Sequence, residues 1–168
     1  MLPLSLTLLQ ASPLGVPAVG APVAMQEAQV AALLANHSDK TLVVNFFATW
    51  CTPCVRELPA LQTVVLNHPE VRGLLISLDE VRDAPRVAHF ATEQSLRLPL
   101  VHLQSTTPSA TAAKLVKDWP DRIPVTLVVA AGGAELARLV GNIDVVALEG
   151  ALGLGAPGGA GGASSAGR

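Results

Sequence analysis

Residues 41–58, TLVVNFFATWCTPCVREL, decide the fold, because they place two cysteines between a predicted strand and a predicted helix. Residues 41–48 are apolar except for Asn45 and rich in β-branched and aromatic side chains, as is typical of a central strand covered on both faces. Cys51 falls at the junction, and Cys54 lies about one helical turn later. Because side chains at i and i+3 on a helix are neighbours, this pair can form a disulfide without backbone distortion.

The rest of the chain predicts a mixed sheet with helices on both sides. A helix over 54–68 separates the strand over 41–48 from one over 71–79, and such a crossover makes the two strands parallel. Residues 123–141 predict two strands joined by a turn at Gly132-Gly133. Further helices are predicted over 24–40, 83–94, 107–119 and 142–152, and a short strand over 97–104.

Three side chains are candidate helix caps. Thr107 or Ser109 is placed to cap the helix over 107–119, and Asn142 to cap the helix over 142–152. Pro59, inside the helix over 54–68, removes one backbone hydrogen bond and predicts a kink there.

Composition favours one domain and excludes several kinds of site. The chain has 168 residues, of which 50% are hydrophobic and 14% are charged, so it can bury one core. A net charge of −2 without a basic stretch argues against nucleic acid or an anionic membrane as the partner. The two cysteines cannot fill a four-ligand zinc site alone, and the four histidines lie far from them along the chain, so no metal site is expected.

The two ends of the chain are expected to lie outside the folded domain, which we predict over residues 23–152. Residues 1–22 contain four prolines and a short apolar run, Leu2 to Leu9, which lacks a basic flank and is too short to cross a bilayer. They are interpreted as an N-terminal arm or a signal-peptide remnant. Residues 153–168 are rich in Gly, Ala and Ser, which predicts a flexible tail.

The two sulfur atoms are expected to differ in reactivity. Unpaired N–H groups and a positive dipole at a helix start stabilise a thiolate, which predicts a lowered pKa for Cys51 and makes it the attacking group. Cys54 lies further inside and would resolve the mixed disulfide. Pro53 suits the first turn, where no intrahelical N–H bond is lost. The alternatives are two buried core thiols or half of a zinc site.

Three segments together resemble a known family: VVNFFATWCTPCVRELPAL over 43–61, RIPVTLVV over 122–129 and LARLVG over 136–141. They are similar to the thioredoxin superfamily, and more closely to the TlpA/ResA-like thiol–disulfide oxidoreductases of the bacterial cell envelope. The resemblance covers roughly residues 25–150. It implies a thioredoxin-like three-layer α/β/α sandwich with a mixed central β-sheet, Cys51 as the nucleophile and Cys54 as the resolving cysteine.

The resemblance also implies a substrate-binding surface around the cysteines. Trp50 matches a tryptophan packed beside the motif, and with Pro53 it would contact the partner. Pro124 matches a cis-proline that lies against the disulfide, which would leave the backbone of Ile123 free to pair with an extended substrate segment. Without the resemblance, an ordinary trans-proline opening an edge strand is the simpler interpretation of Pro124.

Glu57, three residues after Cys54, allows two interpretations. A helical glutamate usually faces water. In the envelope branch of the resembled family, however, a glutamate at this place is half-buried near the cysteines, and Asn45 stands where many cytoplasmic thioredoxins keep an aspartate. Since Asn45 cannot exchange a proton, Glu57 is the candidate group for proton transfer with Cys54, with a pKa raised by burial.

Two function classes follow. The first is a protein disulfide reductase, a monomer without a cofactor beyond its redox-active Cys51–Cys54 pair, which serves disulfide-containing protein substrates and is recharged by an upstream dithiol donor. By resemblance it would act in the periplasm or cell envelope, for example in cytochrome c maturation, or in the cytoplasm if no export signal exists. The second is a non-catalytic adaptor whose cysteine pair is structural or holds a metal. A peroxidase is disfavoured, since no cysteine lies outside the pair.

Overall fold

The computed structural model describes residues 16–37 and 39–154. These residues contain six β-strands, five α-helices and one 3-10 turn. The strands are β1 (Val23–Met25), β2 (Thr41–Phe47), β3 (Val71–Ser77), β4 (Leu100–Leu103), β5 (Val125–Val129) and β6 (Glu135–Val140). The helices are α1 (Glu27–Ala35), α2 (Thr52–Asn67), α3 (Ala84–Glu93), α4 (Pro108–Leu115) and α5 (Val145–Ala151), and the 3-10 turn, η1, is Val81–Asp83.

The six strands form one mixed sheet in the order β1-β4-β3-β2-β5-β6. The strands β1, β4, β3 and β2 are parallel to one another, whereas β5 runs antiparallel to both β2 and β6. The predicted parallel crossover between β2 and β3 and the predicted hairpin of β5 and β6 are both confirmed. Gly132 and Gly133, at the hairpin turn, have φ angles of 89° and 90°, which glycine adopts readily.

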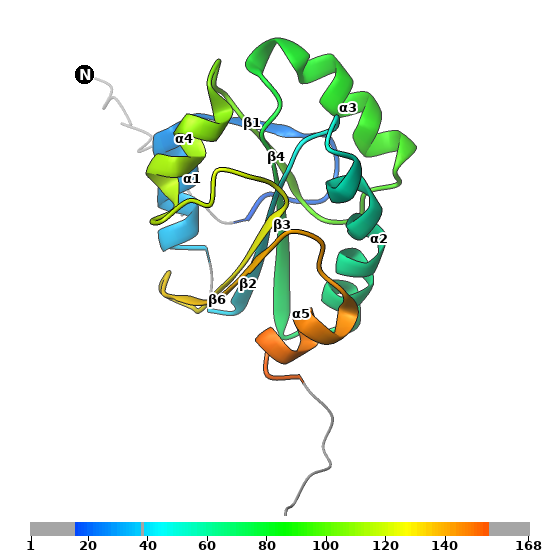
Figure 1. Cartoon of the computed structure of the whole chain (residues 1–168), viewed down its shortest axis with the longest axis vertical. Helices are drawn as coiled ribbons and strands as arrows, with labels where there is room; N and C mark the ends of the chain where they lie inside the picture. The colour runs from blue at the N-terminus through cyan, green and yellow to red at the C-terminus, as the bar shows by residue number, and fades with distance from the viewer. Residues whose placement is uncertain (1–15, 38, 155–168) are drawn as a thin grey trace, which may run out of the picture.

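Helices cover both faces of the sheet, so the molecule has the predicted three-layer α/β/α arrangement (Figure 1). Side chains of α2, α3 and α5 pack on one face, in a core cluster that includes Phe47, Leu75 and both cysteines. Side chains of α1 and α4 pack on the other face, around Phe46 and Ile76. Because adjacent side chains of a strand point to opposite faces, the Phe46-Phe47 pair contributes one ring to each core.

Strand β2 is the centre of the sheet and carries the chain to the cysteine motif. It pairs with β3 on one side and β5 on the other, and residues 42–47 are all buried. A strand covered on both faces needs a continuous apolar run, and this run is why the strand could be predicted from the sequence. Its carboxyl end leads within four residues to Cys51, which precedes the first residue of α2.

The predicted helix over 24–40 is wrong at its start. Residues 23–25 instead form β1, which pairs in parallel with β4 through the partners Val23 and Val101, and the helix begins only at Glu27. A three-residue strand is too short to show a periodicity in sequence, and its pairing with residues some eighty positions away decides its conformation.

Two of the predicted caps are also corrected. Asn142 does not cap the last helix, because α5 begins later and Oδ1 of Asp144 accepts the Ala147 N–H at 2.7 Å. Thr107 occupies the N-cap position of α4 but its side chain makes no capping hydrogen bond, and Ser109 lies inside the helix. Instead, the Ser105 hydroxyl accepts the Thr107 N–H at 2.9 Å and organises the entry into the helix.

Residues 16–22 form no helix or strand. The apolar run at Leu2 to Leu9 and the tail beyond residue 154 lie outside the described residues, so the domain boundaries at 23 and 152 stay predictions. Among the helices that the structure describes, none is long and apolar enough to cross a membrane.

Candidate active site

Cys51 and Cys54 form a disulfide at the start of α2, with Cα atoms 5.2 Å apart. Cys51 is the N-cap residue of this 16-residue helix, and its Sγ accepts the Cys54 N–H at 3.3 Å. Cys51 keeps 5% of its surface exposed and Cys54 none, so Cys51 alone reaches solvent. Pro53 lies in the first turn, as predicted, where its missing N–H costs no helical hydrogen bond.

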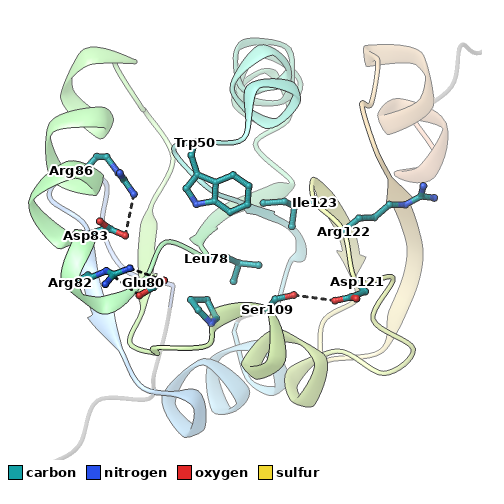
Figure 2. A pocket seen from close by; sticks show the side chains of 11 residues that line it. Trp50, Leu78, Glu80, Arg82, Asp83, Arg86, Ser109, Asp121, Arg122 and Ile123 are labelled. Atoms are coloured by element: carbon teal, nitrogen blue, oxygen red, sulfur yellow. Dashed lines mark hydrogen bonds and ion pairs between the residues drawn. The ribbon is translucent and has the colours of Figure 1, made fainter.

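Trp50, the residue before Cys51, lines a pocket of about 490 Å³. Figure 2 shows the indole of Trp50 and the side chains of Leu78 and Ile123 around its centre, while Arg122 points away from it. Trp50 is 64% exposed, which is unusual for so large an apolar side chain. The remaining lining residues are Glu80, Arg82, Asp83, Arg86, Pro108, Ser109, Asp121 and Arg122.

Most charged groups at the rim of this pocket are paired with one another. Arg86 forms an ion pair with Asp83 at 3.1 Å, and Arg82 pairs with Glu80 at 3.1 Å. Asp121 accepts a long hydrogen bond of 3.4 Å from the Ser109 hydroxyl at one side of the pocket (Figure 2). The apolar centre is therefore surrounded by a rim whose charges largely compensate.

The loop before β5 lies beside the motif and contains the one cis peptide bond in the described part of the chain, Ile123-Pro124. Ile123 packs against the core cluster that contains both cysteines. The Pro124 carbonyl accepts the Gly141 N–H at 2.9 Å, whereas the backbone of Ile123 has no hydrogen-bond partner among the described residues. The cis geometry that the resemblance implies is thus present, with an unused donor and acceptor next to it.

Glu57 is buried under the motif, so the interpretation of a water-facing side chain is wrong. Only 4% of its surface is exposed. Its Oε1 accepts the Asn45 amide at 2.8 Å, and its Oε2 accepts the Ile143 N–H at 3.0 Å. The same Asn45 amide donates to the Thr126 hydroxyl at 2.9 Å, so β5 fixes the Asn45 side chain that holds the carboxylate.

Burial raises the pKa of Glu57 above its usual value, because removal from water disfavours the charged carboxylate. The hydrogen bonds from Ile143 and Asn45 favour the charged form and offset part of this effect. The Asn45 Oδ1 is buried and has no hydrogen-bond partner in the described part of the chain. A carboxyl group with a raised pKa, on the same helix face as Cys54, is suited to exchange a proton with that cysteine.

Asp79 is a buried acidic residue beside the motif that sequence reasoning missed. Its carboxylate is fully buried and accepts hydrogen bonds from the backbone N–H and the hydroxyl of Thr49, at 2.9 and 2.6 Å. A signal was available, because an acidic residue directly after a buried parallel strand lies at the edge where such sheets build their sites.

No group of three or more His, Cys, Asp or Glu side chains within the described ranges is arranged to hold a metal ion.

Curated relatives match parts of the chain. A thiol-disulfide oxidoreductase, ResA, from Bacillus cereus (strain ZK / E33L) is 24% identical over 120 residues, covering 71% of this chain and 65% of that protein. A thioredoxin from Ophiophagus hannah is 38% identical over 50 residues, covering 30% of this chain and 48% of that protein. The chain thus spans between about half and two thirds of the length of these two relatives.

Solved structures show the fold. A thioredoxin-related protein from Neisseria meningitidis serogroup B superposes with a TM-score of 0.59 at 23% identity, covering 70% of this chain and 85% of that one. The expected thioredoxin-like fold is confirmed by this likeness and by the observed sheet. The profile of the AhpC/TSA family matches residues 16–134, more than half of the sequence. The chain therefore belongs to the AhpC/TSA family, within the thioredoxin superfamily.

Proposed function

We propose that this chain is a thiol–disulfide oxidoreductase that exchanges its Cys51–Cys54 pair with disulfides of partner proteins. The observation that carries this proposal is the disulfide at the start of α2, in which Cys51 keeps 5% of its surface exposed and Cys54 none. The similarity to proteins named thiol-disulfide oxidoreductase and thioredoxin supports it.

In the first step, the Cys51 thiolate of the reduced protein attacks one sulfur of a partner disulfide. The partner's S–S bond breaks, its second sulfur leaves as a thiolate, and a mixed disulfide with Cys51 forms. The N-cap position supports this role, because the Cys54 N–H and the positive end of the α2 dipole stabilise a negative charge on Sγ.

In the second step, Cys54 loses its proton and attacks Sγ of Cys51. The mixed disulfide breaks, the partner leaves with both of its sulfurs reduced, and the Cys51–Cys54 disulfide is restored. Glu57 is the group proposed to accept the Cys54 proton, since it shares a helix face with Cys54 and its pKa is raised by burial.

The partner would bind along the exposed surface around the motif. The unused backbone groups of Ile123 can pair with an extended segment of the partner, while Trp50 and Pro53 offer apolar contact beside the attacked bond. Pro124 shapes this loop. The chain would act as a monomer without a cofactor, reducing its partners and drawing electrons from an upstream dithiol donor. A cell-envelope location, and a part in cytochrome c maturation, are proposed only from the resemblance of residues 43–61, 122–129 and 136–141 to the TlpA/ResA-like family.

Trapping the intermediate tests the proposal. In a Cys54→Ser variant the second step cannot occur, so mixed disulfides through Cys51 should accumulate when the protein meets a protein disulfide such as that of insulin. These adducts should be visible on non-reducing gels and disappear with dithiothreitol. The matched Cys51→Ser variant should form none.

The adaptor alternative makes the opposite prediction. A structural or metal-holding pair would give no adduct in Cys54→Ser and no insulin reduction by the wild type. It would instead bind zinc or copper tightly in the reduced protein, which titration with either metal would reveal.

A further inference from the structure

The carboxylate of Asp79 is fully buried just beyond the end of β3. Burial of a charged group is costly unless hydrogen bonds replace its lost water. Here the Oδ2 atom accepts the Ser77 hydroxyl at 2.7 Å and the Thr49 N–H at 2.9 Å, while Oδ1 accepts the Thr49 hydroxyl at 2.6 Å. The half-exposed Arg86 adds a longer contact of 3.4 Å to Oδ1. Two of the three short hydrogen bonds therefore come from one residue, Thr49.

Thr49 is the second residue of the turn that delivers Cys51 to its place. This turn is closed by the Cys51 N–H, which donates to the Ala48 carbonyl at 3.0 Å. It joins the end of β2 to the N-cap of α2, with Trp50 exposed at its tip. Because Asp79 binds both the backbone and the side chain of Thr49, it limits where this turn, and with it Cys51, can move.

Asp79 is itself fixed from the opposite side. Nε2 of the buried His102 lies 3.1 Å from the Asp79 carbonyl, which can only accept, so this nitrogen carries the proton. The other ring nitrogen then accepts the Gln104 amide at 3.3 Å. Since His102 belongs to β4 and Ser77 to β3, the turn is anchored to two strands of the sheet.

We propose that Asp79 is a positioning residue for Cys51: through Thr49 it holds the Ala48–Cys51 turn so that the Cys51 sulfur stays at the N-cap of α2, facing the Cys54 N–H. The inference rests on the proposed function, in which Cys51 is the attacking sulfur. It assigns a role in the reactivity of Cys51 to a carboxylate that does not touch the reacting atoms.

A positioning role and a direct charge effect of Asp79 predict different results. A negative charge near Cys51 raises the pKa of its thiol, so a pure charge effect makes Asp79→Asn lower that pKa and leaves Thr49→Val without effect. A loosened turn weakens the contact between Sγ and the helix start. Under the positioning role, both variants therefore raise the thiol pKa and slow the attack of Cys51.

The experiment measures the reaction of reduced protein with 5,5′-dithiobis(2-nitrobenzoate) between pH 4 and 10, in a Cys54→Ser background so that one thiol reports. In Thr49→Val we expect the apparent pKa of Cys51 to rise by about half a unit and the rate at pH 7 to fall by about threefold to tenfold. Asp79→Asn should change both in the same direction. Thr49→Ser, which keeps the hydroxyl, should restore values close to those of Thr49.

Thr63→Val is the matched control, since the Thr63 hydroxyl binds only the Pro59 carbonyl on the exposed side of α2. Thermal unfolding of every variant shows whether each is folded at the assay temperature. The positioning role would be overturned if both variants, Thr49→Val and Asp79→Asn, had a lowered Tm but kept the wild-type pKa and rate of Cys51. It would also be overturned if Asp79→Asn lowered the pKa of Cys51 while Thr49→Val left it unchanged. If the Cys51 thiol of the parent protein itself reacted no faster than an unfolded thiol, the proposed function would fail instead.

Discussion

The amide of Asn45 donates to the carboxylate of Glu57 across 2.8 Å, and both side chains are buried under the cysteine motif. This contact joins the central strand to α2 at the depth where Cys54 lies. It gives Glu57 a defined place, while burial raises the pKa of the carboxyl group, and three of the predictions below depend on these two properties.

Glu57→Gln should remove the acid limb of the pH–rate profile, which is the fall in exchange rate at low pH. As a proton acceptor, Glu57 works only above its raised pKa, so in the wild type the release of the mixed disulfide slows as pH falls through that value. Glutamine keeps the shape but accepts no proton, and we expect a rate lower by about tenfold or more at neutral pH. Stopped-flow measurement of partner release from pH 4 to 9 checks this; a profile identical to the wild type would remove Glu57 from the mechanism.

Asn45→Leu is the companion variant. The Asn45 hydrogen bond favours the charged form of Glu57, so its loss should raise the pKa of Glu57 further. The acid limb should then move to higher pH while the rate at pH 9 stays close to that of the wild type. A limb that moved to lower pH would contradict the assigned direction.

Glu57 should also make the folded state less stable as pH rises. Its folded pKa lies above the ordinary glutamate value of 4.5, so between these two values the folded protein holds more protons than the unfolded one. The free energy of unfolding should therefore fall as pH increases through this window, by about 1.4 kcal/mol for each unit between the two pKa values. Urea unfolding of wild type and Glu57→Gln at pH 4.5 and pH 7 tests the sign: the difference in stability should shift in favour of the variant at pH 7.

Trp50→Ala should weaken the reaction with protein substrates and leave the reaction with small disulfides nearly unchanged. The indole is 64% exposed beside the pocket, so its removal should change the free energy of unfolding by no more than about 0.5 kcal/mol. The KM for a protein disulfide should rise severalfold, whereas the reaction with a small aromatic disulfide should change little. Equal losses for both kinds of substrate would argue that Trp50 acts on Cys51 rather than on binding.

Gly73, in β3, lies where α2 packs on the sheet, so a larger residue at this position tests that packing. A Cβ atom there would lie 2.9 Å from both Leu98 Cδ1 and Val65 Cγ1, too close without rearrangement. Gly73→Ala should lower the free energy of unfolding by about 1–3 kcal/mol. The control is Gly150→Ala in α5, where a Cβ meets nothing within 4 Å and alanine should stabilise the helix by up to about 1 kcal/mol. Chemical denaturation of both variants compares them; a Gly73→Ala protein as stable as Gly150→Ala would contradict the packing account.

The elements nearest the cysteines could be predicted from sequence because they depend on short, continuous patterns. Strand β2 is an uninterrupted apolar run, and α2 begins where Cys51 and Pro53 predict a helix start. Strand β1 could not be predicted, since its three residues form a strand only through pairing with β4.

The site was predictable in part. The cysteine pair follows from a compact motif, and the cis-proline at position 124 was expected only from the family resemblance. The contacts of the buried Glu57 involve Asn45, twelve positions earlier, and Ile143, 86 positions later. The contacts of Asp79 with Thr49 likewise span 30 positions. Such long-range polar contacts leave no local pattern in the sequence.

The central claim is that Cys51 is the reactive sulfur because it caps α2 and reaches the surface, while Cys54 stays buried. Alkylation of the fully reduced protein with iodoacetamide at pH 7, followed by peptide mass mapping over time, measures this directly. We expect Cys51 to be modified first and with an apparent pKa below the ordinary thiol value of about 8.5, and Cys54 to react far more slowly. Modification of Cys54 first, or slow modification of both, would contradict the account.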